Sequence, residues 1–234
     1  MKILAMDTSS LAASCAILEE ERPVSQFYTD ARLTHSQTIM PMVQAMLSAA
    51  MESLEAVDAF AVSVGPGSFT GLRIGVAAVK GMAQAVNKPC IPVSTLEGLA
   101  WNLQGQQGIA CAVMDARCGQ VYTALFDLEG GAVARLTEDM AIPLEELAEM
   151  LKKQEKNIIL VGDGAVLCYN SLVGQQWAAQ RIVLAPQRLR LQQAASVGLA
   201  ACSHRQQAVE AGELAPAYLR LPQAQRELLQ KQQG

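Results

Sequence analysis

The residues best suited to chemistry form one short polar run, Asp7-Thr8-Ser9-Ser10, which follows the apolar stretch 3–6. A carboxylate, three hydroxyls and the N–H groups of a tight turn can hold phosphate oxygens, or a water molecule on a metal ion. The same run also predicts a simpler structure, an Asx-type turn in which the carboxylate accepts hydrogen bonds from its own backbone. Both interpretations stay open, and the first makes this run a candidate nucleotide-facing turn.

A second carboxylate closes an apolar run in the other half of the chain. The run IACAVMD ends on Asp115 as the first run ends on Asp7, so the two carboxylates are predicted to be counterparts. Ala116 and Arg117 stand where the first run has hydroxyls. Asp115 is therefore the weaker candidate for holding phosphate.

The segment 65–71 (GPGSFTG) is rich in glycine but matches no phosphate-binding pattern. No lysine follows Gly71, as a P-loop requires, and the glycine spacing does not fit the dinucleotide-binding pattern. Ser68 lacks glycines two residues away on either side, so it is no nucleophile elbow. We expect a tight strand-to-helix connection in which Ser68 or Thr70 caps the helix. Ser94 or Thr95, with Glu97, is expected to cap the next helix.

The histidine and cysteine patterns argue against a metal site. The two histidines, His35 and His204, belong to neither His-x-x-x-His nor His-Glu-x-x-His. His35 precedes a predicted helix and could cap it or bind a ligand, whereas His204 is expected in solvent. The six cysteines form no Cys-x-x-Cys pair, which is typical of reduced thiols in a cytosolic protein.

A regular order of strands and helices must position these residues. Apolar runs predict the strands, and three- and four-residue apolar spacing predicts the helices. The elements expected in the first half are strands at 2–7, 13–18 and 24–29, a helix at 36–51, a strand at 58–64, a helix at 69–86, a strand at 90–93 and a helix from Ser94. Those expected in the second half are strands at 109–115, 119–127 and 131–136, a helix at 143–153, a strand at 157–161, a helix at 164–173, a strand at 181–184 and a helix at 192–210.

Each half thus has the order βββαβαβα, the wiring of the ASKHA architecture shared by actin, sugar kinases and Hsp70 nucleotide domains. The expected fold class is α/β with two such lobes. The Gln- and Gly-rich stretch 102–108 is typical of a linker. We therefore expect an N-terminal lobe at 1–103 with partner-binding helices, a C-terminal lobe at 104–222 and a loosely ordered tail at 223–234.

The composition limits the partners and the compartment. A net charge of −4 argues against a chain that grips nucleic acid alone, so RNA would be held mainly through another subunit. Hydrophobic residues make up 51% and charged residues 17%, which leaves apolar surface for a subunit interface. No stretch approaches the roughly 20 apolar residues of a membrane span, and we expect a cytoplasmic protein with no membrane partner.

The helix predicted at 69–86 carries small residues along one side. Gly71, Gly75 and Ala78 recur at three- and four-residue intervals. Each glycine costs a helix roughly 1 kcal/mol relative to alanine, so close packing must return that cost. Packing inside its own lobe is the default explanation, but the low charge of 69–79 also suits a helix from another subunit. We favour the subunit interface.

Several segments together resemble a known family. They are MKILAMDTSS at 1–10, the run from His35 through PMVQAML and, above all, residues 63–100. They resemble the TsaB family of tRNA threonylcarbamoyladenosine biosynthesis proteins, also called YeaZ. The resemblance is weaker over 109–127 and returns at 216–220 (PAYLR).

This resemblance implies a non-catalytic scaffold subunit. TsaB is similar to its catalytic paralogue TsaD, which carries a metal-binding His-x-x-x-His on one helix, and Thr95 and Leu99 stand at the matching positions here. The resemblance thus implies no catalytic residue, no metal and no required cofactor, although ATP or ADP could bind in the complex. The implied partners are a TsaD-type catalytic paralogue and a TsaE-type ATPase. Together they transfer a threonylcarbamoyl group to the tRNA adenosine next to the anticodon, with tRNA bound only through the complex.

The resemblance also implies where partners bind, namely on the helix at 36–51 and on the helical face at 69–82. The residues expected there are His35, Ile39, Met42, Val43, Met46, Phe69, Gly71, Leu72, Gly75, Ala78, Val79 and Met82. A homodimer of the chain alone would use the same surface.

Other functions remain as alternatives. A glycoprotease-like peptidase acting alone would lack its metal ligands, and no cysteine or serine signature replaces them. An ATP-binding ASKHA hydrolase would use Asp7 and the cleft between the lobes. A chaperone-like or cell-division factor rests on fold analogy alone.

Overall fold

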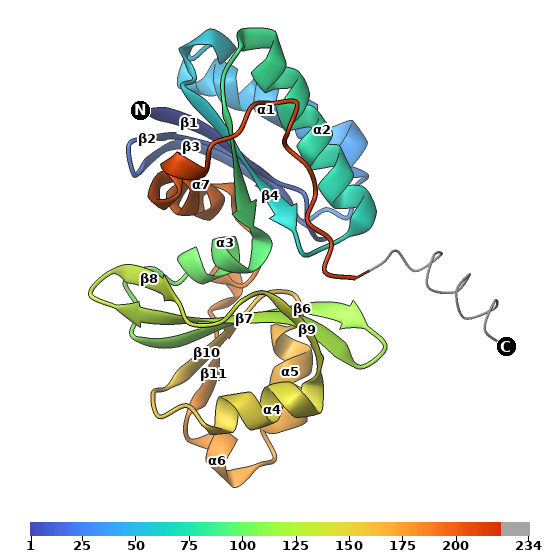
Figure 1. Ribbon diagram of the computed structural model, residues 1–234, viewed down its shortest axis with the longest axis vertical. Coiled ribbons are helices and arrows are strands. Elements are labelled where there is room, and N and C mark those ends of the chain that lie inside the picture. Colours follow the sequence, from blue (N-terminus) through green and yellow to red (C-terminus); the bar gives the residue numbers. More distant parts are fainter. Residues whose placement is uncertain (221–234) are drawn as a thin grey trace, which may run out of the picture.

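Two β-sheets lie one above the other in the computed structural model, which describes residues 1–220 (Figure 1). The tail predicted at 223–234 lies outside the described residues. The first sheet has the order β3-β2-β1-β4-β5, formed by β1 (Lys2–Asp7), β2 (Ala13–Glu19), β3 (Arg22–Thr29), β4 (Ala59–Gly65) and β5 (Cys90–Ser94). The second has the order β11-β10-β6-β7-β8 with β9 paired to β7, formed by β6 (Gly108–Arg117), β7 (Gln120–Glu129), β8 (Ala132–Arg135), β9 (Met140–Pro143), β10 (Ile158–Val161) and β11 (Ile182–Leu184).

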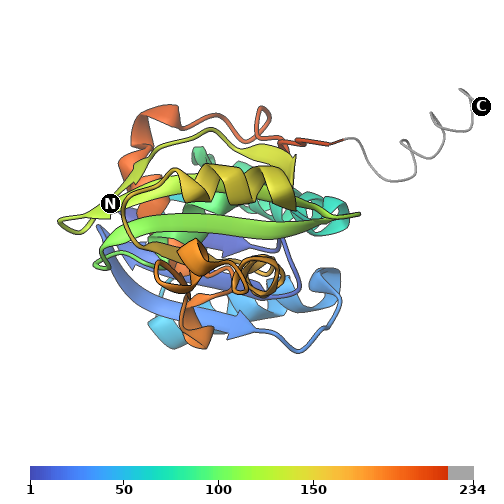
Figure 2. The same ribbon diagram turned by 90° about the horizontal axis from the view of Figure 1, so that it is seen from below.

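Helices cover both faces of each sheet. The longer helices are α1 (His35–Ala50), α2 (Phe69–Val86), α3 (Thr95–Trp101), α4 (Leu144–Lys152), α5 (Ala165–Leu172), α6 (Gln176–Ala179) and α7 (Ala194–Ser203), with short 3-10 turns at Leu54–Ala56, Gln187–Leu189 and Arg205–Gln207. Helices α1 and α2 lie on the outer face of the first sheet, and α3 and α7 lie between the sheets. Helices α4 and α5 cover the outer face of the second sheet (Figure 2).

The continuous apolar runs of the central strands follow from this layering. Strands β1 and β4 pair in parallel, and every residue of β4 is buried. Phe60 and Met6 face the core under α1 and α2, whereas Ile3 and Ala61 face the core under α7. Strands covered on both faces need apolar residues at every position rather than at alternate ones.

The predicted order of elements is confirmed, with two additions in the second half. Strand β9 and helix α6 were not predicted, because runs of four residues carry too little periodicity to be distinguished from a loop. The helix predicted at 192–210 is shorter, since it ends at Ser203. Ser68 caps α2 and Ser94 caps α3, as predicted. Ser68 accepts a hydrogen bond from Gly71 N, and Ser94 accepts one from Glu97 N.

The expected lobe boundary at 103/104 does not separate the two lobes in space. Helix α7 packs on β1 and β2 of the first sheet, and α3 packs on β6 and β7 of the second. The chain after α7 also returns to the first lobe, where Val209 pairs with Cys90. Each sheet has two apolar faces, and the two inner faces are covered by these two helices.

No helix within residues 1–220 combines the length and apolar character that crossing a membrane requires.

Candidate functional site

A cleft of about 360 Å³ lies between the two lobes. Its walls come from the β1–β2 turn, the β4–α2 loop, the β6–β7 turn, the β10–α5 loop and the segment 217–220. The lining residues are Ser9, Ser10, Leu11, Pro66, Gly67, Ser68, Phe69, Met114, Asp115, Ala116, Arg117, Tyr122, Asp163, Ala217, Tyr218, Leu219 and Arg220. Strands β1, β4, β6 and β10 all end at this gap, so it is the place where ligands bind to sheets of this kind.

Asp7 forms an Asx-type turn and does not line the cleft. It is 1% exposed, and its Oδ1 accepts hydrogen bonds from Ser9 N at 2.9 Å and Ser9 Oγ at 2.8 Å. Its Oδ2 accepts a hydrogen bond from Ser63 Oγ. Burial raises the pKa of Asp7, although these hydrogen bonds act in the opposite direction. The simpler of the two interpretations is therefore the one the structure shows.

The rest of the predicted nucleotide-facing turn divides into two parts. Thr8 is buried, and its Oγ1 donates to Gly71 O at 2.8 Å, so Thr8 is lost from the candidate site together with Asp7. Ser9 and Ser10 do line the cleft, but their hydroxyls are engaged with neighbours. Ser10 Oγ donates to Gln192 Oε1 at 2.7 Å. The turn is stabilised by its own lobe and by the segment before α7.

The second lobe repeats the turn with less support. Asp115 Oδ1 accepts from Arg117 N at 2.8 Å, which matches the contact of Asp7 with the residue two positions on. Asp163 from the β10–α5 loop lies beside it, and its Oδ1 accepts from Asp115 N at 3.4 Å. Asp163 is open to the cleft on one side, yet loss of water around its carboxyl group raises its pKa to about 6, and repulsion by Asp115 adds to this. The sequence pattern did not indicate Asp163.

The C-terminal segment runs along the first lobe and ends beside the gap between the two sheets (Figure 1), where residues 217–220 line the cleft. Ala217 N donates to Val64 O at 2.7 Å in the first lobe. Arg220 Nη1 donates to Ala116 O at 2.7 Å in the second. The resemblance at 216–220 was the only signal in the sequence for this segment.

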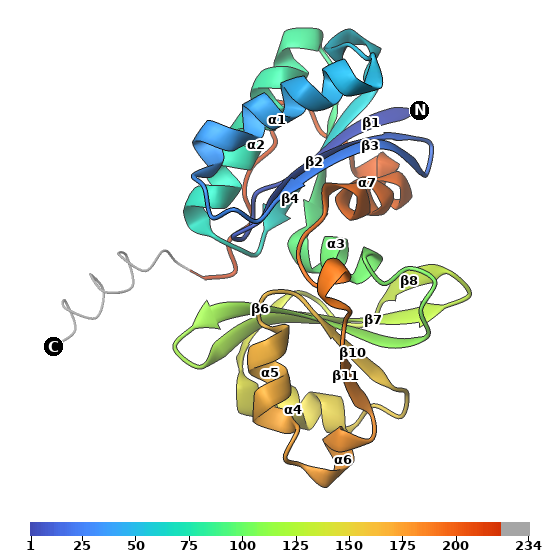
Figure 3. The ribbon, with the colours of Figure 1, turned by 180° about the vertical axis from the view of Figure 1, so that it is seen from behind.

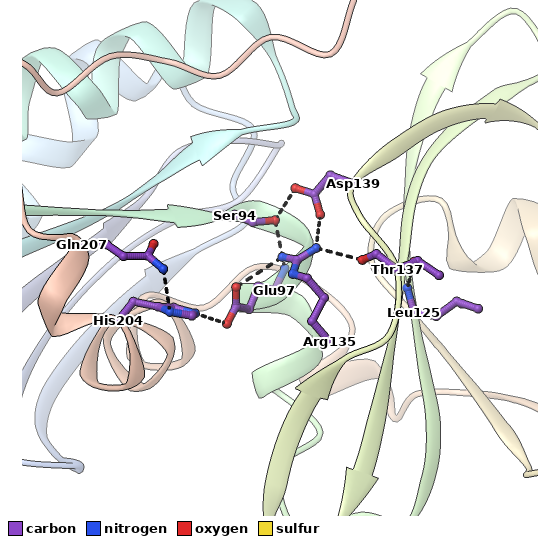
Figure 4. Close-up of polar contacts among 8 residues, drawn as sticks. All are labelled: Ser94, Glu97, Leu125, Arg135, Thr137, Asp139, His204 and Gln207. Carbon is purple, nitrogen blue, oxygen red and sulfur yellow. Dashed lines mark hydrogen bonds and ion pairs between the residues drawn. The ribbon is translucent and has the colours of Figure 1, made fainter.

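A polar cluster joins the lobes away from the cleft mouth (Figure 4). Arg135, the last residue of β8, pairs with Glu97 on α3 at 3.2 Å and with Asp139 at 2.6 Å. His204, at the end of α7, contacts the other Glu97 oxygen at 2.6 Å. Ser94 Oγ donates to Asp139 at 2.6 Å. The expectation that His204 lies in solvent is wrong, because Glu97 reaches it from α3.

Comparison with known proteins identifies the family. The family model described as TsaD: tRNA N6-adenosine threonylcarbamoyltransferase matches residues 29–229. The tRNA threonylcarbamoyladenosine biosynthesis protein TsaB of Bacillus subtilis (strain 168) is 30% identical over 234 residues, which cover 99% of this chain and 100% of that protein. The chain belongs to the TsaB family.

Solved structures agree with this assignment. YeaZ from Pseudomonas aeruginosa is 30% identical with a TM-score of 0.76, and the match covers 93% of this chain and 99% of that one. An activator of 2-hydroxyisocaproyl-CoA dehydratase from Clostridium difficile, solved with bound ADPNP, has a TM-score of 0.51 at 11% identity over 88% of this chain and 96% of that one. The second likeness shows the fold alone. The predicted two-lobed ASKHA fold is confirmed.

In this TsaB chain the two positions matched to metal ligands lie inside the protein. Thr95 and Leu99 are both fully buried on α3, between the two sheets. Residues 1–220 contain no group of three or more His, Cys, Asp or Glu side chains arranged to hold a metal ion.

Gly71 and Gly75 of α2 face their own lobe, so their proposed role in admitting a foreign helix is wrong. A Cβ on Gly71 would collide with Thr8 O, and one on Gly75 would collide with Thr8 Oγ1. The β1–β2 turn occupies the space that the missing side chains leave. Only Gly81, one turn and a half further along, has open space beside it.

Most of the predicted interface side chains form the core under α1 and α2. Those buried there are Ile39, Val43, Met46, Leu72, Val79 and Met82. They are buried because an amphipathic helix places such residues against its own sheet. His35 is half-buried and donates from Nε2 to Ser10 O at 2.7 Å, which holds the β1–β2 turn. Met42, Phe69 and Ala78 remain half-exposed.

Proposed function

We propose that this chain is a non-catalytic scaffold subunit in the biosynthesis of threonylcarbamoyladenosine in tRNA. Its partners are a TsaD-type catalytic paralogue and a TsaE-type ATPase, and the complex transfers the threonylcarbamoyl group to the adenosine next to the anticodon. Membership of the TsaB family supports the pathway, and the name of its Bacillus subtilis relative states it for that protein. The complex works in the cytoplasm, and tRNA reaches this subunit only as part of it.

The observation that carries the scaffold role is the low charge of α1 and α2, the two helices that cover the outer face of the first sheet (Figure 3). Helix α1 has no Asp, Glu, Lys or Arg along its length. Met40 on this helix is 44% exposed, and Met51 at its end is 94% exposed. The two charges of α2 are Arg73 and Lys80, and Lys80 is engaged by the carbonyls of 212 and 214. Exposed helical faces without charge are typical of subunit interfaces.

The surface therefore differs from the one expected from the sequence alone. It consists of exposed residues of the two helices, such as Met40, Ala77 and Gly81. The same surface serves a homodimer when the chain is alone, because one uncharged face can cover another.

Two observations support the proposed lack of catalysis. Thr95 and Leu99 provide no imidazole where the resemblance implies metal ligands, and both are packed in the core. The oxygens of Asp7 are occupied by Ser9 and Ser63, which leaves no carboxylate on this turn to orient a water molecule for an ATPase. The proposed role requires no cofactor in this subunit.

Mass spectrometry of tRNA tests the pathway. Cells depleted of this chain should lose threonylcarbamoyladenosine, and a normal level of the modified base would overturn the proposal. Expression of the chain should restore it.

Co-purification with the TsaD-type partner tests the interface. Gly81→Arg adds a large cation to the uncharged face where a Cβ meets nothing within 4 Å, so the variant should fold but lose the partner. Gly174→Arg is the matched control, because residue 174 is equally open but lies in the second lobe. Equal recovery of the partner by both variants would exclude this face.

A further inference from the structure

Three planar side chains are stacked at the mouth of the cleft. The guanidinium of Arg73 lies 3.8 Å from the ring centroid of Phe69. The rings of Phe69 and Tyr218 are 4.8 Å apart at 31°. Arg73 Nε also donates to Tyr218 Oη at 3.0 Å, so each of the three side chains contacts the other two. Tyr218 is 41% exposed.

Arginines gather at the same place, although the chain is acidic overall. Arg117 and Arg220 both line the cleft, and Arg73 belongs to the stack. Within residues 1–220, neither Arg73 nor Arg220 forms an ion pair. Arg220 donates instead to the neutral carbonyl of Ala116. The side chain of Arg117 is 81% exposed and lies 3.8 Å from Asp115. We call Phe69, Arg73, Arg117, Tyr218 and Arg220 the cleft-mouth cluster.

Two carboxylates restrict which part of a ligand can enter. Asp115 and Asp163 lie side by side in the cleft wall, where they would repel a phosphate group. Carboxylates accept hydrogen bonds from hydroxyl groups, and the 2′-hydroxyl of ribose is what distinguishes RNA from DNA. A ligand with a flat base, an anionic phosphate and a ribose matches the stack, the arginines and the carboxylates in turn.

We propose that the cleft-mouth cluster binds one unpaired ribonucleotide of an RNA strand. The base stacks on the exposed face of Tyr218, Arg117 and Arg220 contact the adjoining phosphates, and a ribose hydroxyl donates to Asp115 or Asp163. Single-stranded RNA is bound in this way, through aromatic and arginine planes with cations along the backbone. The inference rests on the proposed function, which supplies tRNA as the RNA.

A purely structural role is the competing explanation, since the stack also anchors residues 217–220. That role accounts for Arg73, Phe69 and Tyr218, which contact one another. It does not account for Arg117, which extends into solvent at the same mouth and contacts none of the three.

Fluorescence anisotropy with a labelled tRNA anticodon stem-loop tests the proposal, using the full chain alone and with its TsaD-type partner. Arg117→Gln should weaken binding and lower the slope of log affinity against log salt by about 1. Arg22→Gln is the matched control, because Arg22 is also exposed and paired with an acid but lies on β3, at the edge of the first sheet. Its affinity and slope should equal those of the unchanged chain.

Two further comparisons separate stacking from charge. Tyr218→Leu, which lacks a ring, should bind about fivefold or more weakly than Tyr218→Phe, which keeps one. The same stem-loop made of DNA should bind more weakly than RNA. Circular dichroism of each variant checks that the fold is retained.

Equal affinity and salt slope for Arg117→Gln and Arg22→Gln would overturn the inference, as would a lack of RNA binding in both preparations. Loss of the protein partner on Arg117→Gln would also overturn it, because the cluster would then bind protein. If depletion removes the tRNA modification while these variants bind RNA normally, this inference fails and the proposed function stands. A normal modification level after depletion would defeat the proposed function instead.

Discussion

The side-chain oxygen of Thr8 occupies the place that a Cβ on residue 75 would need. Thr8 also donates to Gly71 O, one turn earlier on α2. The small residues of this helix thus join it to the β1–β2 turn of the same lobe. This contact supports the position of Ser9 and Ser10 at the cleft.

Gly75→Ala should destabilise the protein by about 1–3 kcal/mol, because the added methyl group meets Thr8 in a packed core. Gly81→Ala should have the opposite effect and add up to about 1 kcal/mol, since its Cβ is free and alanine favours the helix. Urea unfolding of both variants measures the difference. A smaller cost for Gly75→Ala in a Thr8→Ala background would identify the colliding atom, and equal effects of the two glycine changes would contradict this account.

Asp163 should make stability depend on pH. Its pKa is raised from 3.8 to about 6, so the folded state binds the proton more tightly than the unfolded chain. The stabilisation that this provides is complete below pH 3.8 and is lost as the pH rises through about 6. As the pH rises from 3.8 to about 6, the free energy of unfolding of the unchanged protein should fall relative to that of Asp163→Asn.

Urea midpoints at several pH values between 4 and 7 measure this effect. Glu149→Gln, on the exposed side of α4, is the control and should follow the unchanged protein. Parallel curves for the unchanged protein and Asp163→Asn would refute the pKa.

Glu97→Gln should cost about 1–3 kcal/mol of stability, because it leaves Arg135 and His204 with weaker partners in a partly buried cluster. The side chain of Glu97 is 12% exposed, so water cannot replace the lost charge fully. Thermal or urea unfolding measures the loss. A double-mutant cycle with His204→Gln should show coupling, and strict additivity would rule out the pairing in Figure 4.

Arg220→Ala should loosen the C-terminal segment without unfolding the lobes. The bond from Arg220 to Ala116 O is the contact that ties this segment to the second lobe. Hydrogen exchange at the amide of Ala217 should become faster. Its hydrogen bond to Val64 O opens more often once the segment has lost its contact with the second lobe. Arg117→Ala is the control, because it removes a neighbouring cation but keeps the bond from Arg220 to Ala116 O. Equally fast exchange at Ala217 in Arg117→Ala would contradict the role given to that bond.

Local patterns were sufficient for the order of most elements. Apolar periodicity depends on residues close in sequence. Ser68 and Ser94 could be predicted as caps for the same reason. The family could be predicted because its motifs are contiguous, mainly at 63–100.

Contacts between distant residues decided the rest. Whether Gly75 admits another chain or its own lobe depends on Thr8, which lies 67 positions earlier and comes close only through the sheet. The pairing of His204 with Glu97 and the crossing of Arg220 to Ala116 likewise join residues more than 100 positions apart. Composition and spacing determine which residues are apolar, polar or small, but the tertiary structure determines which neighbour each one meets, because packing brings together residues that no sequence window contains.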